Sequence, residues 1–579
     1  MKKIFILLYF ISMGIKGQHK TNLITPFEKS NGIKTATYKQ TINYYQKLAK
    51  IFPEITLKTM GMTDSGKPLH LIIFNADKEF DFDKIHQSNK NILLINNGIH
   101  PGEPDGIDAT MMLLRNISQS KKLKNLYHNI VIAAIPIYNI GGALNRNSTT
   151  RVNQNGPLSY GFRGNARNFD LNRDFIKNDT KNAQAFAQIF HLVKPDVFID
   201  NHVSNGADYQ YTLTHLFTQH NKLGGNLGAY LYHTMMPEML KDLHQKGIDA
   251  TPYVNVFNKV PEVGFSQFLD LPRYSTGYTT LFNTLGMMVE THMLKPYKPR
   301  VEVTYQLMLS ALNFIQKNGK GIKKIRQQAF DRILTQKIYP LSWQIDSSKT
   351  TTLQFKGFEG KYIKSEVTGL KRLKYYRDKP FVKPVTYYDY FKPKTSIEIP
   401  KAYIIPQGFW PIIKRLKLNK VTLVPLKRDT VLSVEVYHIA NYKTRTRPFE
   451  GHYLHYNTKT SKTVESIVAK KGDYLIPLKP YTARYVLETL EPTAPDSFFN
   501  WNFFDTILQQ KEGFSPYVFE DLAINILKNN SQLKANFEAK KKTDTKFAKN
   551  WYAQLSYIYN HSKYKEKAYL RYPVYRIKK

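Results

Sequence analysis

The chain has 579 residues, enough for roughly two to four domains. Its 42% hydrophobic and 22% charged content is close to that of ordinary globular proteins and argues against a disordered chain. Lys and Arg outnumber Asp and Glu by 84 to 45, a formal net charge of +39, but no helix-turn-helix, zinc-finger or RNA-binding pattern accompanies this charge, so we expect no nucleic-acid partner. Anionic cell-wall polymers or other anionic surfaces fit the charge better, and a solvated basic surface without a specific partner is the alternative. The absence of cysteine excludes disulfides, a cysteine nucleophile and a cysteine-ligated zinc.

The first predicted element is a signal peptide at residues 1–17. Lys2 and Lys3 precede an apolar run at residues 4–15, which is shorter than the ~20 residues of a membrane-spanning helix. An uncleaved membrane anchor is the alternative. No later run is apolar enough to span a membrane, so we expect an exported protein, secreted or periplasmic, with no transmembrane segment after signal removal.

Helix-like and strand-like runs alternate from about residue 35 to residue 318. The patterns predict helices at residues 38–52, 106–117, 182–193, 223–243 and 301–316, and strands at 69–74, 92–97, 130–137, 197–200 and 285–290. Such alternation predicts an α/β fold, with a mostly parallel or mixed open sheet and helices on both faces. We place this domain at residues 18–325.

The pattern changes at residues 317–324, which are rich in Lys and Gly. We expect a connector at residues 326–346, and then a β-rich module at 347–579 whose spacing becomes helical from residue 516 to form a helical tail. Its aromatic cluster at residues 498–504 fits core packing better than stacking on sugars or peptides. No motif indicates what this module does.

Two strand ends carry candidate metal ligands. His100-Pro-Gly-Glu103 follows the strand-like run at 92–97, and His202 follows the run at 197–200. A catalytic zinc needs three protein ligands, and in open α/β sheets such ligands gather at the carboxyl ends of strands. Glu290 ends a third apolar run, where an ionised carboxylate is costly unless it is paired or functional. Each of these patterns is a weak signal when taken alone, but the ordered set predicts a zinc hydrolase.

A polar loop between these motifs offers a carboxylate clamp. In Asp170-Leu-Asn172-Arg173, the guanidinium provides a planar fork and the amide adds a donor. A polar turn with a surface Arg is the alternative. The same loop also contains other basic side chains, Arg146, Arg151, Arg163 and Arg167.

These motifs, in this order, resemble the zinc carboxypeptidase family of the carboxypeptidase A type. Residues 38–53 and the segment Gly61-Met-Thr-Asp-Ser-Gly-Lys-Pro-Leu69 are also similar to the family's first helix and strand entry. The resemblance covers about residues 35–318. The family often has Arg before the ligand Glu where this chain has Gly102, and the long separation of His202 from Glu290 implies an insertion around residues 213–271.

The resemblance implies a role for each matching residue. One Zn²⁺ per chain would be bound by His100, Glu103 and His202. Glu290 would be the general base that activates the zinc water. The substrate carboxylate would be held by Asn172 and Arg173. An Arg of the loop would polarise the scissile carbonyl, and Arg151 is the first candidate and Arg146 the second. The family's mobile Tyr would be Tyr274 or Tyr278. Arg273 fits a structural ion pair better than a position in the specificity pocket.

The implied function is an exported zinc metallocarboxypeptidase that hydrolyses the C-terminal peptide bond of peptides. The same chemistry on cell-wall muropeptides or N-acyl amino acids is the first alternative. The basic charge favours muropeptides, and the Asp-Leu-Asn-Arg motif also occurs in the aspartoacylase group, which cleaves N-acyl amino acids. A catalytically inactive module that binds peptide or cell wall is an alternative of another class. The presence of Glu290 favours the enzyme.

Overall fold

The computed structural model describes residues 23–578, so the predicted signal peptide lies outside the described part of the chain. The central element is an eight-stranded sheet with the order β1-β2-β4-β3-β5-β9-β6-β7. Its strands are β1 Ile55–Met62, β2 Pro68–Phe74, β3 Asn91–Asn96, β4 Ile130–Ile135, β5 Val197–Ser204, β6 Leu213–Phe217, β7 Ala250–Pro252 and β9 Leu285–His292. Strands β4, β3, β5 and β9 run parallel, whereas β1, β2 and β6 join antiparallel neighbours. The predicted mixed α/β sheet is therefore confirmed.

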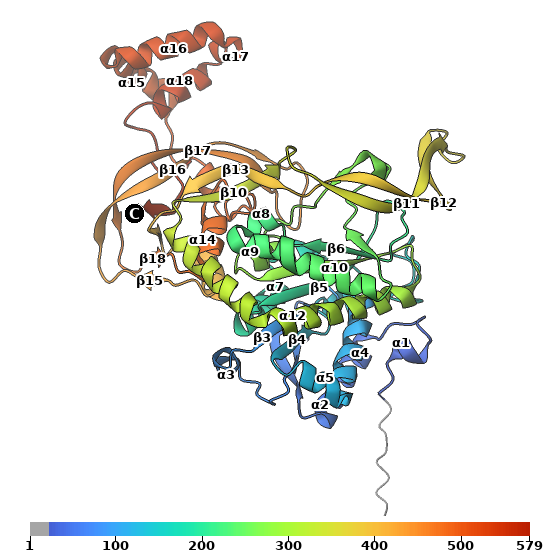
Figure 1. The fold of residues 1–579 in the computed structure, drawn as a ribbon. Coiled ribbons are helices and arrows are strands. Elements are labelled where there is room, and N and C mark those ends of the chain that lie inside the picture. The colour runs from blue at the N-terminus through green and yellow to red at the C-terminus, as the bar shows by residue number, and fades with distance from the viewer. Residues whose placement is uncertain (1–22, 579) are drawn as a thin grey trace, which may run out of the picture.

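Helices cover both faces of this sheet (Figure 1). The helices are α1 Pro26–Lys29, α2 Tyr38–Ile51, α3 Phe82–Gln87, α4 Asp105–Gln119, α5 Lys121–Leu126, α6 Ile140–Leu144, α7 Lys181–Val193, α8 His220–Leu223, α9 Gly225–Tyr230, α10 Met236–Gln245, α11 Ser275–Thr280 and α12 Tyr297–Thr335. One face packs against α2, α4, α9, α10 and α12, and the other against α7, α11 and the C-terminal module. Because both faces are covered, β3 and β4 are apolar along almost their whole length and fully buried.

One segment differs from the sequence expectation. The expected break at residues 317–324 is absent, because α12 runs through it as one helix of 39 residues. Residues 213–271, where we expect an insertion relative to the family, contain two strands that extend the central sheet: β6 pairs with β9, and β7 pairs with β6.

The C-terminal half is built mainly from strands, as predicted. Its strands are β10 Ile338–Ile345, β11 Thr351–Lys364, β12 Lys371–Tyr388, β13 Phe391–Glu398, β14 Ala402–Ile405, β15 Val424–Pro425, β16 Thr430–Thr444, β17 His455–Ala469, β18 Tyr474–Pro477 and β19 Tyr575–Ile577. They form a six-stranded sheet, the β10–β13 pair, and a three-stranded sheet in which β12 pairs with β8 (Phe265–Ser266) of the preceding domain. The helices α13 Trp410–Leu418 and α14 Ala483–Leu490 complete the module.

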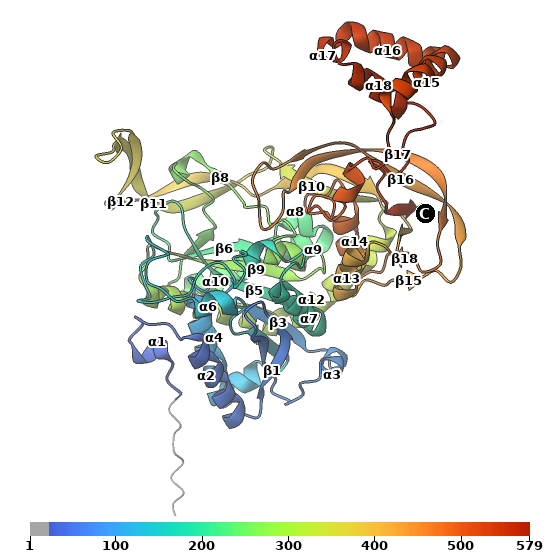
Figure 2. The same cartoon turned by 180° about the vertical axis from the view of Figure 1, so that it is seen from behind.

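A small helical unit stands away from the rest of the molecule (Figures 1 and 2). It consists of α15 Pro516–Asn529, α16 Ser531–Thr543, α17 Thr545–Ala548 and α18 Trp551–Asn560, which share a core around Phe519, Phe537 and Phe547. The predicted helices are present but do not end the chain, because β19 returns to pair with β14 and β16.

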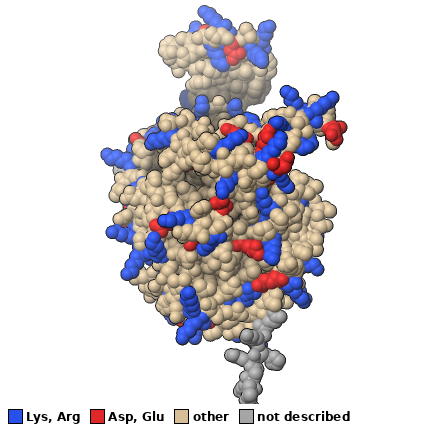
Figure 3. All heavy atoms as spheres, turned by 45° about the vertical axis from the view of Figure 1, so that its right-hand side comes forward, with Lys and Arg blue, Asp and Glu red and all other residues tan. Residues whose placement is uncertain are grey.

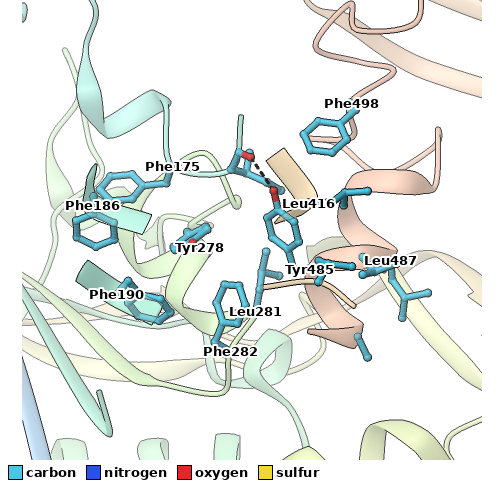
Figure 4. Close-up of a cluster of buried hydrophobic side chains, with 14 of the residues drawn as sticks. Phe175, Phe186, Phe190, Tyr278, Leu281, Phe282, Leu416, Tyr485, Leu487 and Phe498 are labelled. Carbon is cyan, nitrogen blue, oxygen red and sulfur yellow. Dashed lines mark hydrogen bonds between the residues drawn. The ribbon is translucent and has the colours of Figure 1, made fainter. Parts of the chain in front are cut away.

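The two halves share one hydrophobic core. Phe282, which follows α11, stacks on Tyr485 of α14 with ring centroids 5.9 Å apart (Figure 4). The aromatic cluster at residues 498–504 supports the same core: Phe498, Phe499, Trp501 and Phe504 are fully buried, which confirms that the cluster packs inside. The C-terminal module is therefore packed firmly onto the α7 and α11 face of the sheet.

The basic side chains do not gather at one place on the face shown in Figure 3, where Lys and Arg are scattered among uncharged residues. Across residues 23–578, no helix combines the length and the hydrophobicity needed to cross a membrane.

Candidate metal centre and substrate cavity

The order of the strands brings the predicted ligands together. The chain leaves β3 at the His100 turn and builds β4 on one side of β3, then β5 on the other, so the carboxyl ends of β3 and β5 border a switch point. In the adjacent parallel strands β5 and β9, His202 and Glu290 are direct register partners. Sequence positions almost two hundred residues apart therefore meet at one edge of the sheet.

His100, Glu103 and His202 each offer a ligand atom, and these atoms all lie within 4.8 Å of one another. The Nδ1 atoms of His100 and His202 lie 3.3 Å and 3.1 Å from carboxylate oxygens of Glu103. All three side chains are buried, and the Nδ1 of His100 has no hydrogen-bond partner among the described residues. Two imidazoles and a carboxylate, with one nitrogen left unpaired, fit the donor set of a catalytic zinc.

A carboxylate orients each imidazole by contacting the ring nitrogen that faces away from Glu103. Asp170 lies 2.9 Å from Nε2 of His100, and Asp200 lies 2.8 Å from Nε2 of His202. Each ring therefore gives its Nε2 to a carboxylate and turns its Nδ1 toward Glu103, the arrangement that fixes metal-binding histidines. Although burial opposes ionisation, His100, Arg163 and Arg173 hold the pKa of the Asp170 carboxyl well below its ordinary value.

Glu290 lines the same cavity as the three candidate ligands. Burial raises the pKa of its carboxyl above the ordinary value; the nearby His202 acts against this shift, and the negative charges of Glu103 and Asp200 add to it. A carboxyl with a raised pKa next to a metal site is suited to accepting and returning a proton.

The cavity has a volume of about 400 Å³. Its wall contains both polar groups and apolar side chains. Most of the predicted site residues line it, together with residues from β5, β6, β9 and the loops that follow β5, β7 and β8. The lining residues are His100, Glu103, Arg151, Arg163, Asn172, Arg173, His202, Val203, Ser204, Asn205, Leu216, Tyr253, Asn255, Phe257, Phe268, Tyr274, Met288 and Glu290.

The predicted carboxylate clamp faces this cavity. The side-chain oxygen of Asn172 accepts a hydrogen bond from the backbone N–H of Ser275, which leaves the amide nitrogen as a donor. The Arg173 guanidinium lies over the Tyr274 ring, 4.5 Å from its centroid, and its Nη1 donates to the Asn172 carbonyl. These contacts fix the direction of the guanidinium.

Two other arginines reach the site. Arg151 donates to Glu103 at 2.9 Å, and it can approach because residue 102 is Gly: a Cβ there would lie 2.6 Å from the Arg151 Cδ. Arg163 donates to Asp170 at 3.0 Å and lies 3.6 Å from Glu103. Although burial lowers it, Asp170, Glu103 and Glu290 raise the pKa of Arg163 overall. Arg163 is therefore a second candidate for the carbonyl.

The structure does not bring Arg146 or Tyr278 to the cavity. Arg146 donates a hydrogen bond of 2.6 Å to the Ser159 carbonyl, and this contact stabilises the loop to which both residues belong. Tyr278 is fully buried in the aromatic core, and its hydroxyl donates to Asn419 at 2.6 Å. Arg273 forms the structural ion pair that was expected, 2.7 Å from buried Asp496.

Tyr253 was missed by sequence reasoning. It follows the short strand β7 and lines the cavity, and burial, together with the charges of Glu290 and Glu103, raises the pKa of its phenol. Its only sequence signal was its place directly after a three-residue strand, which is too short to recognise from periodicity. Arg163 was noted in the loop, but nothing in the sequence separated it from its neighbours.

Comparison with known proteins shows which families and structures this chain is similar to. Residues 41–196 match the family model described as zinc carboxypeptidase. The chain is 22% identical to carboxypeptidase 2 of Trichophyton rubrum over 435 residues, which covers 71% of this chain and 73% of that protein. A metallo-carboxypeptidase from Burkholderia cenocepacia is similar over 49% of this chain and 70% of its own, with 15% identity and a TM-score of 0.37. Carboxypeptidase A from Helicoverpa armigera gives 13% identity, 50% and 73% coverage, and a TM-score of 0.36.

Proposed function

Residues 41–196 belong to the zinc carboxypeptidase family, and from this premise we propose that the protein removes the C-terminal residue from peptides. The matched region contains His100, Glu103 and the Asn172–Arg173 pair but ends before His202 and Glu290. The observation that carries the proposal is that His202 and Glu290 nevertheless lie in the same cavity as the matched residues. A metal site, a proton acceptor and a carboxylate clamp then border one space.

His100, Glu103 and His202 would hold the zinc ion. When bound there, zinc supplies a Lewis acid that polarises a carbonyl and makes water a stronger nucleophile at neutral pH. Asp170 and Asp200 keep both imidazoles turned toward this position. A neutral imidazole is the ligand form, so the Nε2–H of each His would donate to its carboxylate.

Glu290 is the proposed general base. Its carboxylate would take a proton from the attacking water and return it to the nitrogen of the leaving amino acid. Its place opposite His202 in the β5–β9 register puts the proton acceptor beside the metal ligands on a rigid strand rather than on a loop.

Asn172 and Arg173 would hold the terminal carboxylate of the substrate, and this contact would place the last peptide bond beside the metal site. Arg163 and Arg151 are the cavity cations from which the developing oxyanion would gain stabilisation. Both arginines pair with carboxylates of the site, Arg151 with Glu103 and Arg163 with Asp170, but Arg163 is the more exposed of the two, so we favour Arg163.

The substrate's terminal side chain would be apolar. The charged side chains that line the cavity all have proposed roles, and Leu216, Phe268 and Met288 form an uncharged part of its wall. Arg273 is paired with Asp496 and is not available to an acidic side chain. Peptides ending in Phe or Leu should therefore be cleaved faster than peptides ending in Lys or Asp.

Export is a further part of the proposal. It rests on Lys2, Lys3 and the apolar run at residues 4–15. Expression of the full-length chain with its first residues, followed by N-terminal sequencing of the product found outside the cytoplasm, would identify the cleavage site. Retention of the whole chain in the cytoplasm would contradict export.

Zinc content and hydrolysis measured on wild type and Glu290→Gln test the enzyme proposal. Glutamine keeps the size of the side chain but cannot accept the proton. We expect one zinc per chain in both proteins and a loss of kcat of at least about a hundredfold in the variant, within the range for loss of a general base. Unchanged hydrolysis with zinc present would remove Glu290 from this role.

A further inference from the structure

The C-terminal module reaches the candidate active site through the hairpin that joins β16 to β17. At its tip, Phe449 and His452 are paired by two backbone hydrogen bonds, so that Glu450 and Gly451 form a two-residue turn. The Oε2 atom of Glu450 accepts a hydrogen bond of 2.9 Å from the backbone N–H of Asp170. Two residues 280 positions apart are thus joined beside the metal centre.

The residue type at the turn is unusual. The φ angles of Glu450 and Gly451 are 50° and 78°, both in the left-handed region. Two-residue turns of this kind favour Asn-Gly, because Asn tolerates a positive φ better than residues with longer side chains. Asn at position 450 would therefore stabilise the turn more than Glu does. This points to a function for the longer carboxylate side chain.

Other contacts of the module hold the same segment. His452 lies 2.7 Å from the Asp179 carboxylate, and Arg415 of α13 donates to Asp179 at 2.8 Å and to the Lys177 carbonyl at 2.6 Å. The module therefore contacts the segment 170–179 at both of its ends, at Asp170 and at Asp179.

Asp170 links the Glu450 contact to the candidate site, because its carboxylate contacts three groups there. Its Oδ1 pairs with Nε2 of His100 and accepts from the backbone N–H of Asn172, both at 2.9 Å, and its Oδ2 accepts from Arg163 at 3.0 Å. A shift of the Asp170 backbone would move a candidate metal ligand, the carboxylate clamp and the candidate oxyanion group together.

We propose that Glu450 is a positioning residue through which the C-terminal module fixes Asp170, and thereby sets zinc affinity and the rate of hydrolysis. The inference rests on the proposed zinc peptidase function. It gives the C-terminal half an indirect part in the reaction: a residue from outside the family-matched region holds the backbone of Asp170 in place.

The test uses two substitutions at one position. Glu450→Asn suits the positive φ but is one methylene too short for the Asp170 contact. Glu450→Gln keeps both the backbone strain and an acceptor oxygen at the same reach. Lys78→Asn is the matched control, since exposed Lys78 also has a positive φ, 61°, and its exchange tests relief of backbone strain away from the site.

Three quantities are measured on the full-length proteins: zinc retained during titration with a chelator, the melting temperature, and kcat with KM. For Glu450→Asn we expect a melting temperature equal to or above wild type, zinc affinity lower by about tenfold, the low end for loss of an outer-shell partner, and a lower kcat. Glu450→Gln should retain wild-type zinc affinity, and Lys78→Asn should change neither zinc affinity nor kcat. In the metal-free proteins, amide hydrogen exchange at residues 169–175 should be faster in Glu450→Asn alone.

Glu450→Asn with wild-type zinc affinity, kcat and hydrogen exchange would overturn the inference. A lowered melting temperature with unchanged zinc affinity would also overturn it, because the residue would then serve the hairpin only. Failure of the proposed function looks different: wild type itself would bind no zinc or cleave no peptide, whereas the exchange measurement would still report on the Glu450 contact.

Discussion

At the residue scale, the sequence candidates that the structure brings to one cavity include three that follow or end an apolar run. His100, His202 and Glu290 each follow a run of buried apolar residues, and parallel pairing brings such ends to one edge of the sheet. Arg146 and Tyr278 were candidates because the resemblance implies an Arg and a Tyr in these regions without fixing which residue serves. Whether a side chain reaches the cavity is set by contacts distant in sequence, such as Tyr278 with Asn419, and no local pattern encodes them.

The raised pKa of Glu290 predicts the acidic limb of the pH profile. The base acts only when it is ionised, so kcat/KM should fall as the pH drops through the pKa of this carboxyl. Because burial raises that pKa, the limb should lie above the ~4.3 of an ordinary Glu. The measurement is kcat/KM against pH, with zinc content determined at each pH to separate loss of metal from protonation. A limb at or below the ordinary value in fully loaded enzyme would contradict the assignment.

At the scale of elements, the α/β alternation was predictable because the longer helices have helical apolar spacing, and the buried strands such as β3 and β4 stand out between them as short apolar runs. Helix α12 was misjudged because Lys and the two glycines at residues 317–324 are typical of a loop. Its continuity depends on tertiary contact. Gly319 lies against β3, where the side chain of Asn91 donates to the Gly319 carbonyl at 3.0 Å, and a Cβ on Gly319 would lie 2.1 Å from Asn91 Oδ1.

The two glycines of α12 should respond oppositely to alanine. At position 321 the only atom near an added Cβ is the Tyr230 hydroxyl, 4.0 Å away, so Gly321→Ala should stabilise the protein by about 0.5–1 kcal/mol through helix propensity. Gly319→Ala gains the same propensity but clashes with Asn91, so its net effect should be destabilising. Chemical denaturation of both variants measures the difference. Equal stabilisation by both would show that the close approach to β3 is not needed.

At the scale of the whole molecule, the C-terminal module was predicted to be β-rich, but its relation to the active site was not. That relation depends on pairs between residues far apart in sequence, such as Arg273 with Asp496 and Asp170 with Glu450. A sequence pattern reveals an amphipathic strand but not the surface on which the finished sheet will pack. The shared core and the Glu450 contact join the two halves into one structural unit.

The Arg273–Asp496 pair should contribute strongly to the joining of the halves. Both side chains are buried, and Asp496 also accepts from Trp501 Nε1. Arg273→Ala would leave this carboxylate buried without its cation, so we expect a loss of about 3–5 kcal/mol in the free energy of unfolding. Lys470→Ala, which breaks an exposed pair with Asp429, should cost no more than about 1 kcal/mol. Equal costs measured by denaturant unfolding would show that the buried pair does not stabilise the joined halves.

The central claim is that Asn172 and Arg173 present the last peptide bond to the metal centre. Its most direct test is mass spectrometry of the products from one peptide ending in Phe, offered as the free acid and as the C-terminal amide. The account predicts that the free acid loses a single residue and that the amide, which lacks the carboxylate, remains essentially intact. Equal cleavage of both peptides, or cleavage at internal bonds, would contradict it.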